Sequence, residues 1–292
     1  MKLNQRRFPI VWSRQSLTLA LTSCALLASA LMADQNVSKI VTLAAEPSYS
    51  HRYRLLHQLP DAALDGQAED LIAFMRAQRV PAGMNEAEYM SLVNDIYNLL
   101  LKNGTQVQRL FEICLEVIPD QEAGRIWRDY CMQKLGYTLD RDDIAPANIH
   151  SALQILDAAT QGAYPRMQGT AFIVAYMHKD LSFDPQPGFL DVKILGSRAL
   201  SAAKDESIPL IDRITALQTA AKCRYPGTLE YAASLIAERE QGEPMLKVVA
   251  IACIGQLGSP AQQPLLDEYR LSADIRLRSA ARTALRKIKE QS

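Results

Sequence analysis

The fold is decided by two stretches, Leu-Lys-Val-Val-Ala-Ile-Ala-Cys-Ile-Gly-Gln-Leu at 246–257 and Leu-Arg-Ser-Ala-Ala-Arg-Thr-Ala-Leu-Arg-Lys-Ile at 277–288. In both, apolar or small residues fall at offsets of 3, 4, 7, 8 and 11 from the first leucine. Side chains at these offsets lie on one face of an α-helix. The same face therefore occurs twice, 31 residues apart, which indicates a repeated helical unit.

Looser copies of this pattern occur earlier in the chain. Each copy has an apolar residue followed by Arg or Lys, and then a small residue three positions later. In one copy Asp212 replaces the apolar residue. The basic positions recur every 31 to 47 residues. The basic and small positions are, in chain order, Arg128 with Cys131, Arg166 with Gly169, Arg213 with Ala216, Lys247 with Ala250, and Arg278 with Ala281.

The pattern resembles the first helix of a HEAT repeat, and the resemblance is strongest over 207–290. It implies an all-α fold, a right-handed superhelical stack of antiparallel helix pairs called an α-solenoid. In such a stack each pair buries its apolar face against its neighbours, and small residues let the helices approach closely.

Helical spacing continues from about residue 57, and Pro and Gly fall between the periodic segments. We divide the chain into a signal peptide or membrane anchor (1–33), a flexible linker (34–56) and a HEAT-like repeat domain (57–292). We predict helices over 66–78, 86–102, 105–117, 122–136, 147–158, 165–178, 188–204, 210–222, 227–239, 243–256, 260–271 and 275–289.

The N-terminus has the pattern of an export signal. Basic residues up to Arg14 precede an uncharged, largely apolar run from Ser16 to Ala33. Ala28-Ser29-Ala30 is a small-x-small cleavage signature, and Ala33 is a second cleavage point. Two alternatives stay open: lipidation at Cys24 in a lipobox-like sequence, or an uncleaved anchor of spanning length. All three predict an exported protein of the periplasm or cell envelope.

Four cysteines follow Cys24, and an exported chain permits disulfides. Cys114 and Cys131 lie on consecutive predicted helices and form the candidate pair. The alternative is two buried thiols, which is also our interpretation of Cys223 and Cys253.

The charge and the polar residues predict no cofactor, metal or catalytic site. No two of the four histidines have metal-ligand spacing on one helix, and no nucleophile elbow, phosphate loop or dinucleotide fingerprint occurs. Lys plus Arg equals Asp plus Glu at 32 each, so we expect no nucleic-acid partner. We interpret the basic stripe of the last helix as a solvated face.

These features lead to one leading function and several alternatives. We expect a non-enzymatic scaffold that acts outside the cytoplasm and binds another protein along the helical repeats. Contact with the membrane is expected only through the N-terminal segment, if that segment is uncleaved or lipidated. The alternatives are a HEAT-like enzyme or enzyme-maturation factor of unknown chemistry, or a structural component of the envelope.

Overall fold

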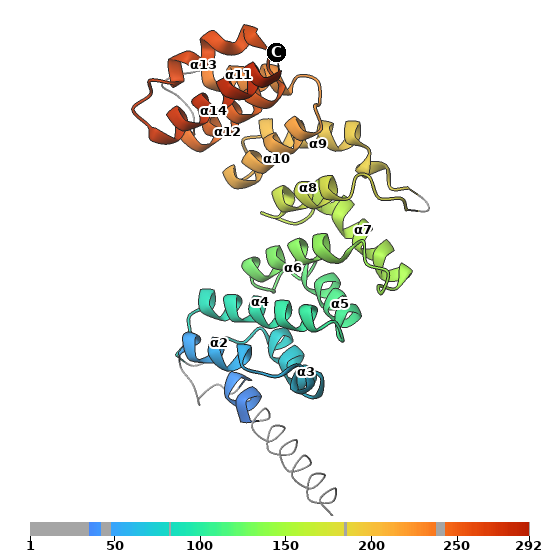
Figure 1. Ribbon diagram of the computed structural model, residues 1–292. Coiled ribbons are helices and arrows are strands. Elements are labelled where there is room, and N and C mark those ends of the chain that lie inside the picture. The colour runs from blue at the N-terminus through green and yellow to red at the C-terminus, as the bar shows by residue number, and fades with distance from the viewer. Residues whose placement is uncertain (1–34, 42–47, 82, 184–185, 238–242, 292) are drawn as a thin grey trace, which may run out of the picture. The chain divides into compact units, whose positions relative to one another are not determined.

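The computed structural model describes residues 35–41, 48–81, 83–183, 186–237 and 243–291, and every regular element in these ranges is a helix (Figure 1). The all-α, solenoid-like fold class expected from the sequence is confirmed. The chain divides into two compact units, one ending at Gln106 and the other beginning at Val107. The repeat domain expected over 57–292 includes the boundary between these two units. None of the described helices has the length and apolarity needed to cross a bilayer.

The first unit contains α2 (Tyr49–His57), α3 (Asp61–Ala77) and α4 (Glu86–Asn103). Both α2 and α3 pack against α4. A capping box begins α4: the Asn85 side chain accepts from the Glu88 N–H at 2.9 Å, and the Asn85 N–H donates to the Glu88 carboxylate at 3.1 Å. Gly104 ends the helix with a φ of 84°, a left-handed conformation that glycine adopts without strain.

The range 34–56, expected as a flexible linker, contains helix in its described residues. Residues 35–41 are helical, and α2 begins at Tyr49. Val37 and Ile40 are buried, and the buried Arg52 side chain donates to the Ile40 carbonyl at 2.5 Å. A buried arginine bonded to a helix carbonyl fixes these two short segments on the unit, although their polar composition indicates a loop.

The second unit is a series of helix pairs (Figure 1). Its α-helices are α5 (Val107–Val117), α6 (Arg125–Thr138), α7 (Pro146–Thr160), α8 (Gln168–Met177), α9 (Val192–Lys204), α10 (Leu210–Lys222), α11 (Thr228–Ala237), α12 (Pro244–Leu257), α13 (Gln263–Tyr269) and α14 (Ile275–Gln291). The short 3₁₀ segments η1 (Gly188–Leu190) and η2 (Pro260–Gln262) precede α9 and α13.

In the second unit, the even-numbered helices from α6 to α14 carry the repeat motif and form one continuous row. In this row α6 packs on α8, α8 on α10, α10 on α12 and α12 on α14. Each motif helix also packs more extensively on the helix before it than on the helix after it. The motif therefore belongs to the second helix of each pair, and our assignment to the first helix is wrong.

Small residues set the spacing of this row. A Cβ built on Gly255 of α12 would lie 2.6 Å from the Cα of Ala284 on α14. That distance is far below van der Waals contact, so only glycine permits this approach. The small motif residues Ala216, Ala250 and Ala281 are also fully buried.

Candidate functional site

The candidate site is built on one face of α7. Pro146 stands in the first turn of this helix, where the missing N–H costs nothing. Ile149 and Leu153 are four residues apart and lie on the same face of the helix. His150, Gln154 and Asp157 follow at offsets of 4 and 7 and form a polar stripe beside the apolar one. The helix thus presents an apolar and a polar edge side by side.

The opposite wall is the connection from α8 to α9. It is anchored at one end by His178, whose buried ring Nε2 lies 2.8 Å from the Gly136 carbonyl oxygen. The Phe183 N–H donates to the Gln186 side-chain oxygen at 2.9 Å, and the Gln186 amide donates to the Leu181 carbonyl at 3.2 Å. Buried Phe189 in η1 anchors the other end. These contacts hold the described part of the connection in place opposite α7.

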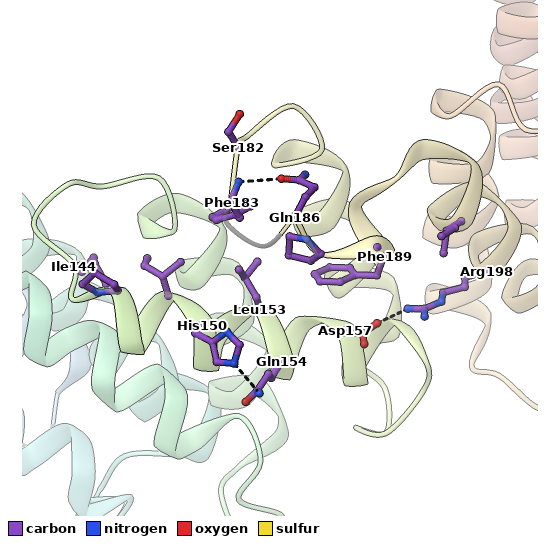
Figure 2. A pocket seen from close by; sticks show the side chains of 15 residues that line it. Ile144, His150, Leu153, Gln154, Asp157, Ser182, Phe183, Gln186, Phe189 and Arg198 are labelled. Carbon is purple, nitrogen blue, oxygen red and sulfur yellow. Dashed lines mark hydrogen bonds and ion pairs between the residues drawn. The ribbon is translucent and has the colours of Figure 1, made fainter.

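Between the two walls lies a cleft of about 640 Å³, which we call the apolar cleft (Figure 2). In Figure 2 Leu153 points from α7 toward the connection that carries Phe183 and Gln186. Its lining is mainly hydrocarbon. The apolar residues are Ile144, Pro146, Ile149, Leu153, Phe183, Pro187, Phe189 and Ile194.

The polar groups of the apolar cleft are paired with one another. The Gln154 amide nitrogen lies 3.0 Å from His150 Nε2, and because an amide nitrogen only donates, this ring nitrogen accepts. Arg198 reaches over from α9, and its Nη1 donates to Asp157 at 2.5 Å and to the Thr160 hydroxyl at 3.0 Å (Figure 2). The ion pair leaves this end of the cleft close to neutral.

A second hollow, the polar cleft, also has Arg198 in its lining. It has a volume of about 840 Å³ and lies among the starts of α8 and α10 and one side of α9. Asp212 lies in its wall and accepts from the Gly169 N–H at 3.1 Å, while its other carboxylate oxygen is buried without a hydrogen-bond partner. Burial raises the pKa of this carboxyl above its ordinary value. The polar cleft also contains Arg166, whose backbone φ is 60°.

Of the basic and small motif residues predicted from the sequence, Arg166 lines the polar cleft, and the others lie outside both clefts. The Arg128 Nε donates to the Ile118 carbonyl at 2.9 Å, and the Arg213 Nε donates to the Ala203 carbonyl at 3.1 Å. The Arg278 guanidinium donates to the Ser272 carbonyl at 2.7 Å. Lys247, at the equivalent position of α12, is buried. Arg128, Arg213 and Arg278 therefore join α6, α10 and α14 to the end of the preceding helix or to the connection just after it.

None of the cysteines in the described residues forms a disulfide, and the candidate pair Cys114 and Cys131 is present as two thiols in this structure. The two nevertheless face each other across the α5–α6 pair, where both are fully buried and share a hydrogen bond. Burial, and then the neighbouring thiol, raise the pKa of Cys131. Burial also raises the pKa of Cys223 to about 11 and that of Cys253 to about 12. Cys24 lies outside the described residues.

No group of three or more His, Cys, Asp and Glu side chains in the described residues could hold a metal ion. His150 lines the apolar cleft, an assignment that the sequence did not provide. The stripe of His150, Gln154 and Asp157 is visible in the sequence, but the other wall begins some thirty residues later. Only the packing of the connection against α7 makes the stripe part of a site.

Comparison with known proteins gives two similar folds and no family. No family model matches the chain, and no curated protein matches it significantly. The structure of human deoxyhypusine hydroxylase in complex with glycerol is similar over 91% of this chain and 99% of its own, with 15% identity and a TM-score of 0.30. A designed armadillo repeat protein is similar over 87% of this chain and 98% of its own, with 12% identity and a TM-score of 0.28.

The first of these structures corrects our functional expectation. We expected a non-enzymatic scaffold because the sequence combines helical repeats with no familiar catalytic motif. The hydroxylase is an enzyme among the structures that this chain resembles, so the step from repeats and missing motifs to a scaffold is wrong. The likeness assigns no substrate or reaction to this chain.

Proposed function

We propose that this protein binds a small, largely apolar ligand in the apolar cleft between α7 and the α8–α9 connection. The observation that carries the proposal is a hollow of about 640 Å³ walled by eight apolar side chains with a few polar groups along one edge. Small-molecule sites have this volume and this composition.

The energetic argument rests on exposed hydrocarbon in the wall. Ile194 is 44% exposed although it lies in a concave, mostly apolar surface. Each square ångström of such surface that a ligand covers contributes about 25 cal/mol, so an apolar ligand gains free energy where it covers Ile194 and the other accessible hydrocarbon of the wall. His150 and Gln154 then provide hydrogen-bonding groups for one polar end of the ligand.

In this proposal the protein binds the ligand without changing it chemically, and no residue of the cleft acts as a catalyst. His150 Nε2 is engaged by Gln154, and Asp157 is engaged by Arg198. A group already held in a hydrogen bond or ion pair suits recognition of a polar end. Chemical change of a bound ligand, lost on substitution of His150, would contradict this part of the proposal.

Titration with the uncharged fluorophore N-phenyl-1-naphthylamine tests the proposal. We expect saturable enhancement of its fluorescence by the wild-type protein and a loss of affinity of about tenfold or more in Ile194→Glu, because a buried carboxylate must be desolvated. The matched control is Leu271→Glu, which changes an 80% exposed leucine outside the cleft and leaves binding unchanged. Equal binding by both variants would overturn the proposal.

We also propose that the protein is exported. The basic segment and apolar run of 1–33 support this location, and they lie outside the described residues. Fractionation of cells that express the chain with its native N-terminus, followed by mass measurement of that end, distinguishes cleavage after Ala30 or Ala33, lipidation of Cys24, and an intact anchor. Recovery of the unprocessed chain in the cytoplasm would contradict export.

We further propose that the protein binds no nucleic acid and has a protein partner. The balance of 32 basic and 32 acidic residues supports the absence of a nucleic-acid ligand. A protein partner stays a prediction from the sequence, and affinity capture from the envelope with the native N-terminus intact is the measurement that tests it.

A further inference from the structure

Arg198 stands at the junction of three hollows. It lines the apolar cleft, the polar cleft, and a smaller hollow formed with Lys193 and Tyr225. Its side chain is 30% exposed, so the guanidinium is held by the protein yet remains accessible to a ligand. A ligand that fills the apolar cleft as far as Asp157 therefore ends beside this arginine.

Only one end of the Arg198 guanidinium is engaged. Nη1 makes both of its hydrogen bonds, to Asp157 and to Thr160. A guanidinium carries five N–H donors, and the Nε and Nη2 donors of Arg198 have no partner among the described residues. These donors lie in one plane and form the fork that a carboxylate accepts with its two oxygens.

The carboxylates of the adjoining polar cleft do not bond to this fork. Asp205 accepts from the N–H and the hydroxyl of Ser207, and Asp212 accepts from the Gly169 N–H. Arg166 and Lys193 line the adjoining hollows and add positive charge near Arg198. Asp205 and one oxygen of Asp212 are thus engaged by other groups, and neither carboxylate bonds to the Nε and Nη2 donors of Arg198.

We propose that the ligand of the apolar cleft is an amphiphile with a single carboxylate head, which binds the free fork of Arg198 while its hydrocarbon chain lies along Leu153 and Phe189. This inference rests on the proposed function, because it names the class of ligand for the same cleft. Arg198 is the specificity-determining residue. Asp157 holds Arg198 in position and competes with the ligand for its charge.

The test compares dodecanoate with dodecanol, which has the same chain without the charge, by calorimetric titration below the concentration at which either aggregates. We expect dodecanoate to bind the wild-type protein about tenfold more tightly or better, since a charge-assisted pair of hydrogen bonds has at least that effect. The readout is the ratio of the two affinities. Arg198→Gln brings the ratio close to one, and Asp157→Asn raises it because the competing carboxylate is gone.

Controls and outcomes separate this inference from the proposed function. Arg282→Gln changes an exposed arginine of α14 that lies outside the cleft and leaves the ratio as in the wild type. Equal affinity of the wild-type protein for both compounds overturns carboxylate recognition and leaves the apolar site standing. Failure of both compounds to bind overturns the site itself. A fall of the ratio in Asp157→Asn would show that the ion pair only supports the structure, and would also overturn the inference.

Discussion

At the scale of single residues, the recurring arginines satisfy backbone carbonyls that a helix leaves open at its C-terminal end. The last four carbonyls of a helix have no partner within it. Arg128 donates to Ile118 just beyond α5, and Arg213 donates to Ala203 in the last turn of α9. A positive charge at the negative end of a helix is favourable as well. Arg128, Arg213 and Arg278 therefore connect the two helices of their pairs and line neither cleft.

Replacing Arg213 by Ala tests this role. We expect a loss of about 1–2 kcal/mol in the free energy of unfolding, since a hydrogen bond from a charged group to a partly buried carbonyl is removed. Urea denaturation monitored by circular dichroism measures the loss. Arg282→Ala is the matched control, because Arg282 is exposed on α14. If the two variants have the same free energy of unfolding, the hydrogen bond from Arg213 to Ala203 does not stabilise the α9–α10 pair.

The buried thiols predict a dependence of stability on pH. Burial raises the pKa of Cys253 from its ordinary 9.0 to about 12. In the unfolded chain the thiol ionises near 9, while in the folded protein it stays protonated. Its contribution is therefore complete below pH 9 and is lost as the pH rises toward 12, by about 1.4 kcal/mol per pH unit.

Comparison of the wild type with Cys253→Ala between pH 8 and 11 isolates this slope. The difference in unfolding free energy should shrink as the pH rises, because only the wild type has the thiol. Cys223→Ala provides a milder reference, since the half-buried Cys223 thiol has its pKa raised only to about 11. A constant difference between wild type and Cys253→Ala across this range would contradict the burial of that thiol.

At the scale of helices, two glycines predict opposite effects of the same substitution. A Cβ on Gly255 would meet the backbone of Ala284 at 2.6 Å, whereas a Cβ on Gly66 of α3 meets nothing within 4 Å. Gly255→Ala should cost about 1–3 kcal/mol by overpacking. Gly66→Ala should gain about 0.5–1 kcal/mol from helix propensity. Thermal unfolding of both variants measures this, and stabilisation by Gly255→Ala would contradict the close approach of α12 and α14.

Most helices were predicted from the sequence, because each has apolar residues at helical spacing and the same residues are buried between helices in the structure. The ranges predicted from 86 to 289 each contain a helix of the structure, with ends that differ by a few residues. The helices before Leu59 could not be predicted, because their polar composition indicates a loop and the contact of Arg52 with the Ile40 carbonyl forms only in the folded protein. The motif alone could not show whether its helix is the first or the second of a pair. That depends on whether helices such as α10 and α12 pack mainly on the preceding or on the following helix.

At the scale of the whole chain, the site depends on segments that only the fold brings together. His150, Gln154 and Asp157 are an ordinary polar helix stripe by themselves, and Arg198 belongs to a different helix pair. No local pattern links Leu153 to Phe189, which face each other across the cleft (Figure 2). The repeat motif reports how the stack is built, while the site lies on the other helices and on a connection with no repeat pattern.

The most direct test of the central claim is hydrogen–deuterium exchange of the whole protein with and without N-phenyl-1-naphthylamine. We predict slower exchange in peptides from α7 (Pro146–Thr160) and from 186–198, the two walls of the apolar cleft. Peptides from α12 and α14 should exchange equally in both conditions and serve as an internal control. Protection confined to α12 and α14, or no protection at saturating fluorophore, would contradict a ligand site in the apolar cleft.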